Sequence, residues 1–158
     1  MLPLVFEKLG HQILASYDFR GDETITVSGE SLLEVMRRLK EDPAFDFNLL
    51  MDLGGVDYLT FGEKRPRFEV VYHLYSTGKN HRIRVKVPIE EKEPSVPSLV
   101  RIWPAADWYE REVWDLFGIR FTGHPNLKRI LMYDEFVGHP LRKDYPVTKR
   151  QPLIGPKN

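Results

Sequence analysis

Four charged side chains stand close together in the sequence, at Glu110, Arg111, Glu112 and Asp115. Carboxylates held near one another can transfer protons to and from a substrate, so the cluster is a candidate acid/base site. On a helix, Arg111 and Asp115 are four residues apart and can pair, which makes ion pairs at an interface an equally good interpretation. The tryptophans around the cluster would keep such pairs partly dry. The residue types and spacing leave both interpretations open.

A short repeat surrounds two histidines farther along the chain. Gly123-His124-Pro125 precedes Leu127-Lys128-Arg129, and Gly138-His139-Pro140 precedes Leu141-Arg142-Lys143. Because proline holds the preceding residue in an extended conformation, each histidine is expected on a stiff turn with two basic groups behind it. A metal site would use both histidines and a carboxylate, but the sequence has no H-E-x-x-H motif. We expect hydrogen-bonding structural histidines, with a partner contact and a metal site as alternatives.

Several motifs of enzymes are missing from the chain. It has no cysteine, which excludes disulfides, a cysteine nucleophile and thiolate-bound iron–sulfur clusters. It has no G-x-G-x-x-G dinucleotide fingerprint, no phosphate-binding loop and no G-x-S-x-G nucleophile elbow. If the protein takes part in redox metabolism, another chain must bind the nucleotide and the clusters.

The elements that position these residues belong to a core domain over residues 1–118. The expected helices cover residues 4–14, 32–39 and 104–117. The expected strands cover residues 24–28, 47–53, 68–75 and 82–87, the last two as a hairpin. Ser31 with Glu34 predicts a capping box, Gly54-Gly55 a strand break, and Gly118 the end of the last helix. The basic face of residues 82–87 is expected to be solvated.

Residues 119–158 form what we call the C-terminal arm, where regular patterns fade. The arm holds five of the twelve prolines, and eight Lys or Arg against three Asp or Glu. Apolar residues such as Leu131, Phe136, Tyr145 and Leu153 recur between the basic ones. Apolar anchors with basic residues between them are typical of a segment that lies along a partner. A loop folded back on its own domain is the alternative.

The composition as a whole limits the possible partners. Lys plus Arg equals Asp plus Glu, 23 each, which argues for neither nucleic acid nor an anionic membrane. A nucleic-acid-binding arm remains a minor alternative, and it predicts affinity that falls with salt. No apolar run approaches the ~20 residues that span a bilayer. The first residues resemble neither a signal peptide nor a transit peptide, so membrane association is expected only through a partner.

The stretch from Trp103 to Ile119, W-P-A-A-D-W-Y-E-R-E-V-W-D-L-F-G-I, closely resembles the signature of one protein family. The family is the 30-kDa subunit of respiratory complex I, known in bacteria as the C subunit of NADH-quinone oxidoreductase. The likeness continues from Phe121 through G-H-P-N-L-K-R-I-L-M to G-H-P-L-R-K-D-Y-P, and it includes R-F-E-V-V-Y-H-L at residues 67–74. The resemblance covers nearly the whole chain.

The resemblance implies an α/β fold of the α+β type: a mixed sheet with flanking helices and an extended, mostly irregular C-terminal arm. It implies a non-catalytic member of the peripheral arm that docks on the D subunit (49-kDa type), which helps form the quinone site. The B subunit and other hydrophilic-arm proteins are expected nearby. FMN, iron–sulfur clusters and quinone are expected in partner chains, with no catalytic, cofactor or metal residue in this one. The complex would lie at the cytoplasmic face of the bacterial membrane (the matrix side in mitochondria).

The residues expected to form the family signature and partner interface are Glu110, Arg111, Glu112, Asp115, Phe117, Gly118, His124, Pro125, Lys128, Arg129, Ile130, Leu131, His139, Pro140, Leu141, Arg142, Lys143, Asp144, Tyr145 and Pro146. Three arginines, Arg111, Arg129 and Arg142, are expected hot spots, with the acidic cluster as counterparts within or between chains. One alternative is the equivalent subunit of a related membrane-bound hydrogenase or other-donor dehydrogenase. Another is a free-standing metal-dependent hydrolase that uses the acidic cluster and the two histidines.

Overall fold

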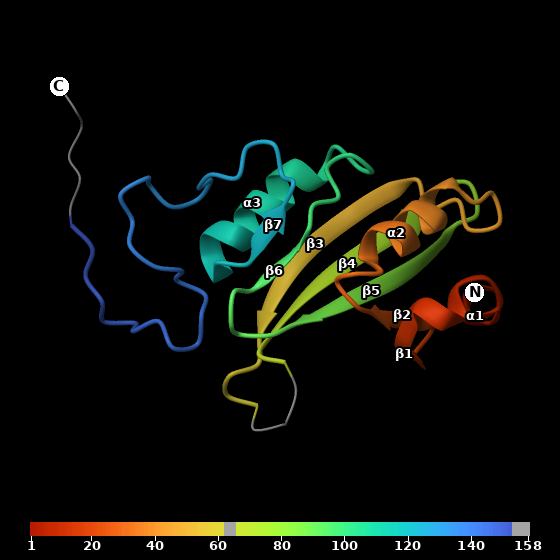
Figure 1. Cartoon of the computed structure of the whole chain (residues 1–158), viewed down its shortest axis with the longest axis horizontal. Helices are drawn as coiled ribbons and strands as arrows, with labels where there is room; N and C mark the ends of the chain where they lie inside the picture. The colour runs from red at the N-terminus through yellow and green to blue at the C-terminus, as the bar shows by residue number, and fades with distance from the viewer. Residues whose placement is uncertain (62–65, 153–158) are drawn as a thin grey trace.

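The computed structural model describes residues 1–61 and 66–152 and has one five-stranded sheet at its centre (Figure 1). The helices are α1 (Leu2–Leu9), the 3-10 turn η1 (Gly10–Gln12), α2 (Leu32–Glu41) and α3 (Ala106–Phe117). The strands are β1 (Ile13–Phe19), β2 (Asp22–Val27), β3 (Leu49–Asp57), β4 (Phe68–Ser76), β5 (His81–Ile89), β6 (Ser95–Pro97) and β7 (Arg120–Thr122). Among the described residues, none of the helices is both long enough and apolar enough to span a bilayer.

The large sheet has the strand order β1-β2-β5-β4-β3. Strand β2 pairs with β5 in parallel, and every other pair in this sheet is antiparallel. The predicted hairpin of β4 and β5 is confirmed by nine paired positions, from Phe68 opposite Ile89 to Ser76 opposite His81. The expected fold class, a mixed sheet with flanking helices, is therefore confirmed.

One face of the sheet forms the core, because α2 and α3 pack on it. Alternate residues of β4 and β5, such as Tyr72 and Val85, are completely buried there. The apolar side of α2, with Val35 and Met36 fully buried, lies on the same core, as the helical spacing predicted. The intervening strand residues, among them His73, point to the opposite face and are partly exposed.

Helix α3 connects the two strands of a second, smaller sheet, in which β6 and β7 pair in parallel. Gly118 ends the helix in the left-handed conformation, with φ of 74°, as predicted. The predicted start at Pro104 is wrong, because the first helical residue is Ala106. Neither short strand was predicted, since three residues are too few to show an alternation. Residues 120–122, in the range assigned to the arm, thus pair with the core domain.

The N-terminal prediction needs correction. The expected helix over residues 4–14 ends at Leu9, and Ile13 begins β1. Strand β1 escaped prediction because it lies at the edge of the sheet and buries few side chains; Leu14 is 63% exposed and Phe19 61%. The predicted capping box is also wrong: Ser31 makes no side-chain capping bond, and its hydroxyl instead accepts a hydrogen bond from that of Ser28.

The predicted break at Gly54-Gly55 is wrong, because both glycines lie inside β3. A Cβ added to Gly55 would stand 2.8 Å from the ring of Phe117, the last residue of α3. A Cβ on Gly54 would meet nothing within 4 Å. Gly55 therefore allows the end of α3 to approach the sheet closely.

Candidate functional site

Asp115, in the last turn of α3, is fully buried, and its carboxylate binds backbone N–H groups of the arm. Its Oδ2 accepts hydrogen bonds from three consecutive N–H groups, those of Ile130 (3.1 Å), Leu131 (2.9 Å) and Met132 (2.8 Å). Its Oδ1 accepts one from Nη1 of Arg129 at 2.5 Å. Burial alone would raise the pKa of Asp115, but the N–H groups and the guanidinium lower it below the ordinary value. We call these five residues the Asp115 cluster.

Arg129 and Arg142 bind main-chain carbonyls around the same end of α3. Nη2 of Arg129 donates to the carbonyls of Phe136 (2.7 Å) and Gly138 (3.1 Å). Nε of Arg142 donates to the carbonyl of Phe117 at 2.6 Å. The last carbonyls of a helix have no partner inside it and carry partial negative charge, so a cation there is favourable. Two of the three predicted hot-spot arginines, Arg129 and Arg142, are thus engaged within the chain.

His139 also binds the end of α3. Its Nδ1 donates to the main-chain carbonyl of Asp115 at 2.9 Å. Burial lowers the pKa of His139, with the nearby arginines adding to the effect, so the ring is a neutral donor at pH 7. Gly118 leaves room for this contact, because a Cβ there would stand 2.6 Å from the His139 ring and 2.7 Å from Nη2 of Arg142.

His124 binds near the other end of the helix. Its Nε2 donates to the carbonyl of Asp107 (3.2 Å), while its Nδ1 accepts from the N–H of Asn126 (3.0 Å). The carbonyls that His124 and His139 bind are eight residues apart in α3, about 12 Å along the axis. In the described part of the chain, no three His, Asp or Glu side chains are placed to hold a metal ion. The two histidines of the repeat do not meet in one site.

Arg111 has other partners than the sequence suggested. The predicted pair with Asp115 is wrong, because Arg129 occupies that carboxylate. Nε and Nη2 of Arg111 instead donate to the carbonyls of Lys128 (3.2 Å) and Arg129 (3.1 Å). Its guanidinium carbon stands 5.2 Å from the centre of the Trp108 ring, within reach of a cation–π interaction. Arg111 thus fastens the start of the arm to α3.

Glu110 and Glu112 pair with no arginine among the described residues, so within the chain only Asp115 of the acidic cluster pairs with an arginine, and pairing between chains stays a prediction. Glu110 is fully buried and accepts hydrogen bonds from the Ser98 hydroxyl and the Leu99 N–H, both at 2.6 Å. Burial raises the pKa of Glu110 to about 7, although these two hydrogen bonds oppose the rise. Glu112 is exposed and makes no side-chain hydrogen bond to any described residue.

A second anchor, which sequence reasoning missed, joins the arm to the ends of β3 and β4. Nε and Nη2 of Arg67 donate to both carboxylate oxygens of the buried Asp57, at 3.1 and 3.0 Å. Nη2 also binds Asp144 at 2.7 Å, and Nη1 binds Glu91 at 2.5 Å. The N–H of Lys143 donates to Asp57 at 2.9 Å. No predicted pairing pointed to it, because the strand expected over residues 47–53 stopped short of Asp57.

Five apolar side chains of the described arm point outward, whereas Ile119 and Phe121 are buried in the core and Leu127, Ile130, Met132, Phe136 and Tyr145 are half-buried. The exposed members are Leu131 (55%), Tyr133 (38%), Val137 (63%), Leu141 (49%) and Val147 (101%). Of the other predicted interface residues, Pro125, Lys128, Lys143, Asp144 and Pro146 are exposed, while Phe117, Ile130, Pro140 and Tyr145 are half-buried.

In Figure 1 the arm, drawn in blue, lies on the side of α3 away from the N-terminus. The described arm thus folds back on its own domain through polar contacts and through the buried side chains of Ile119 and Phe121, and it displays part of its apolar groups outward. The anchor expected at Leu153 lies outside the described residues.

A family profile described as "Respiratory-chain NADH dehydrogenase, 30 Kd subunit" matches residues 25–151. The chain is 52% identical over 135 residues to the C subunit of NADH-quinone oxidoreductase from Roseiflexus castenholzii, covering 85% of this chain and 76% of the relative. It is 48% identical over 151 residues to the protein of the same name from Citrifermentans bemidjiense, covering 94% and 91%.

Two solved structures have the same fold. One is the trypsin-resistant fragment (1-134) of Nqo5, with a TM-score of 0.72 and 38% identity over 80% of this chain and 98% of the fragment. The other is a chain of the archaeal membrane-bound sulfane sulfur reductase, a respiratory membrane complex, with a TM-score of 0.78 and 26% identity over 93% and 84%. The protein therefore belongs to the 30-kDa subunit family of the respiratory-chain NADH dehydrogenase.

Proposed function

We propose that this chain is a non-catalytic peripheral component of a proton-pumping NADH:quinone oxidoreductase, which docks on the D subunit and holds it in position. The B subunit and other hydrophilic-arm proteins would be further neighbours. FMN, iron–sulfur clusters and quinone would be bound by partners, and the chain would reach the cytoplasmic face of the membrane only through the complex. The names of the relatives, at 48–52% identity, support the choice of complex.

The observation that carries the proposal is the outward set of apolar side chains on an arm that is already fastened. The Asp115 cluster and the Arg67 anchor fix the backbone, while side chains such as Leu141 and Val137 remain 49% and 63% exposed. Apolar surface gains about 25 cal/mol per Å² when it leaves water. A partner that covers these groups would gain that energy without having to order a flexible segment.

Such a protein would contribute to the complex by fixing the position of the D subunit accurately. Small displacements of reacting groups can slow a reaction by orders of magnitude. An ordered arm that binds the D subunit would keep the quinone site at a constant distance from the iron–sulfur cluster that reduces the quinone. The chain would thereby support electron transfer from NADH to quinone, coupled to proton translocation, without taking part in the chemistry.

Leu141→Asp tests the docking role, with Leu33→Asp as the control, because Leu33 is a leucine of α2 that is 37% exposed. Both purified chains should keep the wild-type circular dichroism and unfolding midpoint, since neither side chain belongs to the buried core. Only Leu141→Asp should prevent the chain from co-purifying with the D subunit. Normal assembly of the Leu141→Asp complex would contradict the docking role, and normal assembly with lost turnover would indicate a chemical role instead.

A second candidate is the equivalent subunit of a membrane complex that uses another electron donor. The likeness to the chain from the sulfane sulfur reductase supports it, at a lower identity of 26%. Affinity purification of this chain from its native membrane separates the two candidates. Co-purification of a flavin-containing, NADH-binding chain would support the first, and its replacement by a hydrogenase-like or sulfur-reducing chain would support the second.

A further inference from the structure

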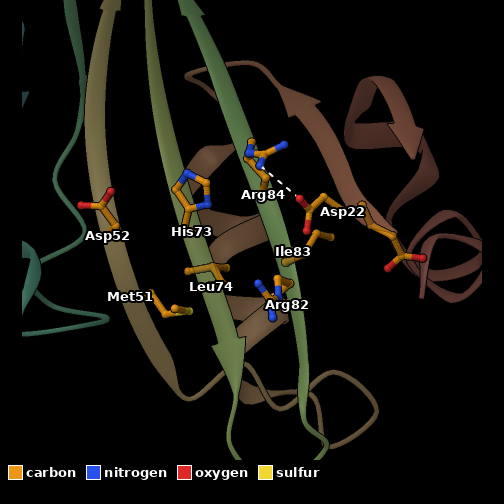
Figure 2. Close-up of a pocket in the computed structure, with 9 residues that line it drawn as sticks. Asp22, Met51, Asp52, His73, Leu74, Arg82, Ile83 and Arg84 are labelled. Carbon is orange, nitrogen blue, oxygen red and sulfur yellow. Dashed lines mark ion pairs between the residues drawn. The ribbon is translucent and has the colours of Figure 1, made fainter. Parts of the chain in front are cut away.

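The face of the large sheet opposite α2 carries a hollow of about 270 Å³. Figure 2 shows the residues around it, with α2 behind the strands. Asp52 of β3 pairs in register with His73 of β4, which pairs in turn with Arg84 of β5. These three side chains stand side by side in one row across the sheet, and Arg82 lies two residues along β5 on the same face (Figure 2).

An irregularity in β3 shapes one wall of the hollow. The register of β3 and β4 shifts between Leu50 and Asp52, so Met51 is an extra residue in the strand. Such bulges redirect side chains and are common beside functional sites. The side chain of Met51 is 47% exposed at the hollow. The Tyr109 hydroxyl donates to the Met51 carbonyl at 3.1 Å, which ties the bulge to α3.

Charged groups elsewhere on this face are paired with one another. Lys86 binds Glu69 at 3.0 Å, the Tyr58 hydroxyl donates to Glu69 at 2.9 Å, and Lys86 also lies over the ring of Tyr17 at 5.9 Å. Their side chains are correspondingly covered, with 13% of Glu69 and 20% of Lys86 exposed. The charged groups at this end of the face pair with one another, so they need no partner from another protein.

The hollow differs, because several of its polar side chains have no hydrogen-bond partner among the described residues. Within residues 1–61 and 66–152, the side chains of Asp52, His73 and Arg82 make no hydrogen bond at all. Arg84 donates to the Thr24 hydroxyl at 3.1 Å and reaches Asp22 only at 3.9 Å, the contact drawn dashed in Figure 2. An unpaired carboxylate, an imidazole and a guanidinium thus surround one concave site beside an exposed methionine.

The residue types around the hollow favour a protein side chain over a cofactor. Small-molecule pockets are typically about 300–1,000 Å³ and mostly enclosed. This hollow lies at the lower end of that range, and it holds an exposed Met on β3 and an exposed Arg on β5, two residue types enriched in protein interfaces. Asp52 lies on β3 and Arg82 on β5, at least two strand spacings apart, about 10 Å or more, so a matching surface must present opposite charges at that separation.

We propose that this hollow is a second docking surface of the chain, distinct from the arm, and that it receives a segment of another protein of the same complex. That segment places a carboxylate between Arg82 and His73 and a basic group against Asp52, with Met51 packed beside it. This inference rests on the proposed function, because it assumes that the chain works inside a multisubunit complex.

The first test places a photo-cross-linking phenylalanine analogue at Met51 in the complete complex, with the same analogue at Leu33 of α2 as the control. The expected result is a cross-link from position 51, absent from position 33, to a peptide of another protein of the complex that contains Asp or Glu. Recovery of the intact complex without any cross-link from position 51 to another chain would overturn the inference.

The second test reverses charge at the hollow. Arg82→Glu should speed dissociation of the chain from the purified complex about tenfold or more, measured by exchange against labelled wild-type chain, because it sets two carboxylates against each other. Arg37→Glu, at an exposed arginine of α2, should leave dissociation unchanged. Changing the cross-linked partner carboxylate to lysine should restore slow dissociation of Arg82→Glu.

The outcomes separate this inference from the proposed function. If Arg82→Glu dissociates like wild type while Leu141→Asp fails to assemble, the hollow is not an interface and the docking role of the arm stands. If Leu141→Asp assembles normally, the arm proposal fails whatever happens at the hollow. If the isolated chain binds a free carboxylate such as citrate with micromolar affinity through Arg82, the hollow is a small-molecule site and the inference is wrong.

Discussion

Replacing Asp115 by asparagine should release the arm from α3 while the rest of the core domain stays folded. The carboxylate accepts four hydrogen bonds, three from backbone N–H groups at 2.8–3.1 Å and one from Arg129 at 2.5 Å. Asparagine has one oxygen and one NH₂ group. If its oxygen faces the three N–H groups, its NH₂ faces a guanidinium; if it flips, its NH₂ faces the three N–H groups. In either orientation the NH₂ group of asparagine, a hydrogen-bond donor, faces another donor, so at least one hydrogen bond is lost.

The expected loss follows from burial. Asp115 is 0% exposed, and the side chain of Arg129 is 13% exposed, so the arginine would lose its counter-ion in a nearly dry site. Breaking a buried ion pair by removing one partner typically costs about 3–5 kcal/mol. Charge-assisted hydrogen bonds are individually worth about 1.5–3 kcal/mol, which agrees with that range. A loss of about 3 kcal/mol corresponds to a change of roughly 100-fold in an opening equilibrium.

Hydrogen exchange measures this opening directly. In Asp115→Asn, the amides of Ile130, Leu131 and Met132 should exchange about 100-fold faster than in the wild-type chain, while those of β4 and β5 keep their protection. Asp134→Asn makes the same chemical change at an exposed position of the arm and should leave exchange unaltered. Wild-type protection at residues 130–132 in Asp115→Asn would refute the idea that this carboxylate holds the arm.

Three further predictions concern the supporting structure. Burial raises the pKa of Glu110 from 4.5 to about 7, so its contribution to stability is fully present below the lower value and is lost as pH rises to the higher one. Between pH 5 and 8.5 the wild-type chain should lose roughly 2.5 kcal/mol relative to Glu110→Gln in urea unfolding, and equal losses would contradict this. Gly55→Ala should lower the free energy of unfolding by about 1–3 kcal/mol, because its Cβ would stand 2.8 Å from the Phe117 ring. Gly54→Ala should be better tolerated, because a Cβ there meets nothing within 4 Å, and equal thermal unfolding midpoints of the two variants would contradict this. Arg67→Met should destabilise the chain by about 3–5 kcal/mol in denaturant titration, since it leaves the buried Asp57 without its cation; an unchanged midpoint would mean that the second anchor contributes nothing.

Patterns that depend on near neighbours in the chain were predictable. The apolar stripe of α2, the β4–β5 hairpin and the stop at Gly118 follow from the helical and strand periods and from the backbone freedom of glycine. The exposed edge strand β1 and the short strands β6 and β7 lack enough buried residues to show a period. Their existence depends on hydrogen bonds to strands elsewhere in the chain.

The arrangement of charges was decided only by the tertiary structure. Local spacing paired Arg111 with Asp115, yet Arg129 and three backbone N–H groups from 14 to 17 residues away occupy that carboxylate. A buried carboxylate takes the set of donors that satisfies all its lone pairs, and a single side chain one turn away cannot do so.

The sequence by itself thus determined the family and the mixed sheet, because residue types, motifs and local periods carry that information. Only the tertiary structure decided that the arm binds α3 with its backbone and basic groups and leaves side chains such as Leu141 and Val137 exposed. It also decided that Asp52, His73 and Arg82 meet at one hollow without partners in the described chain. Both outcomes depend on which segments approach each other in space, and no local pattern encodes that.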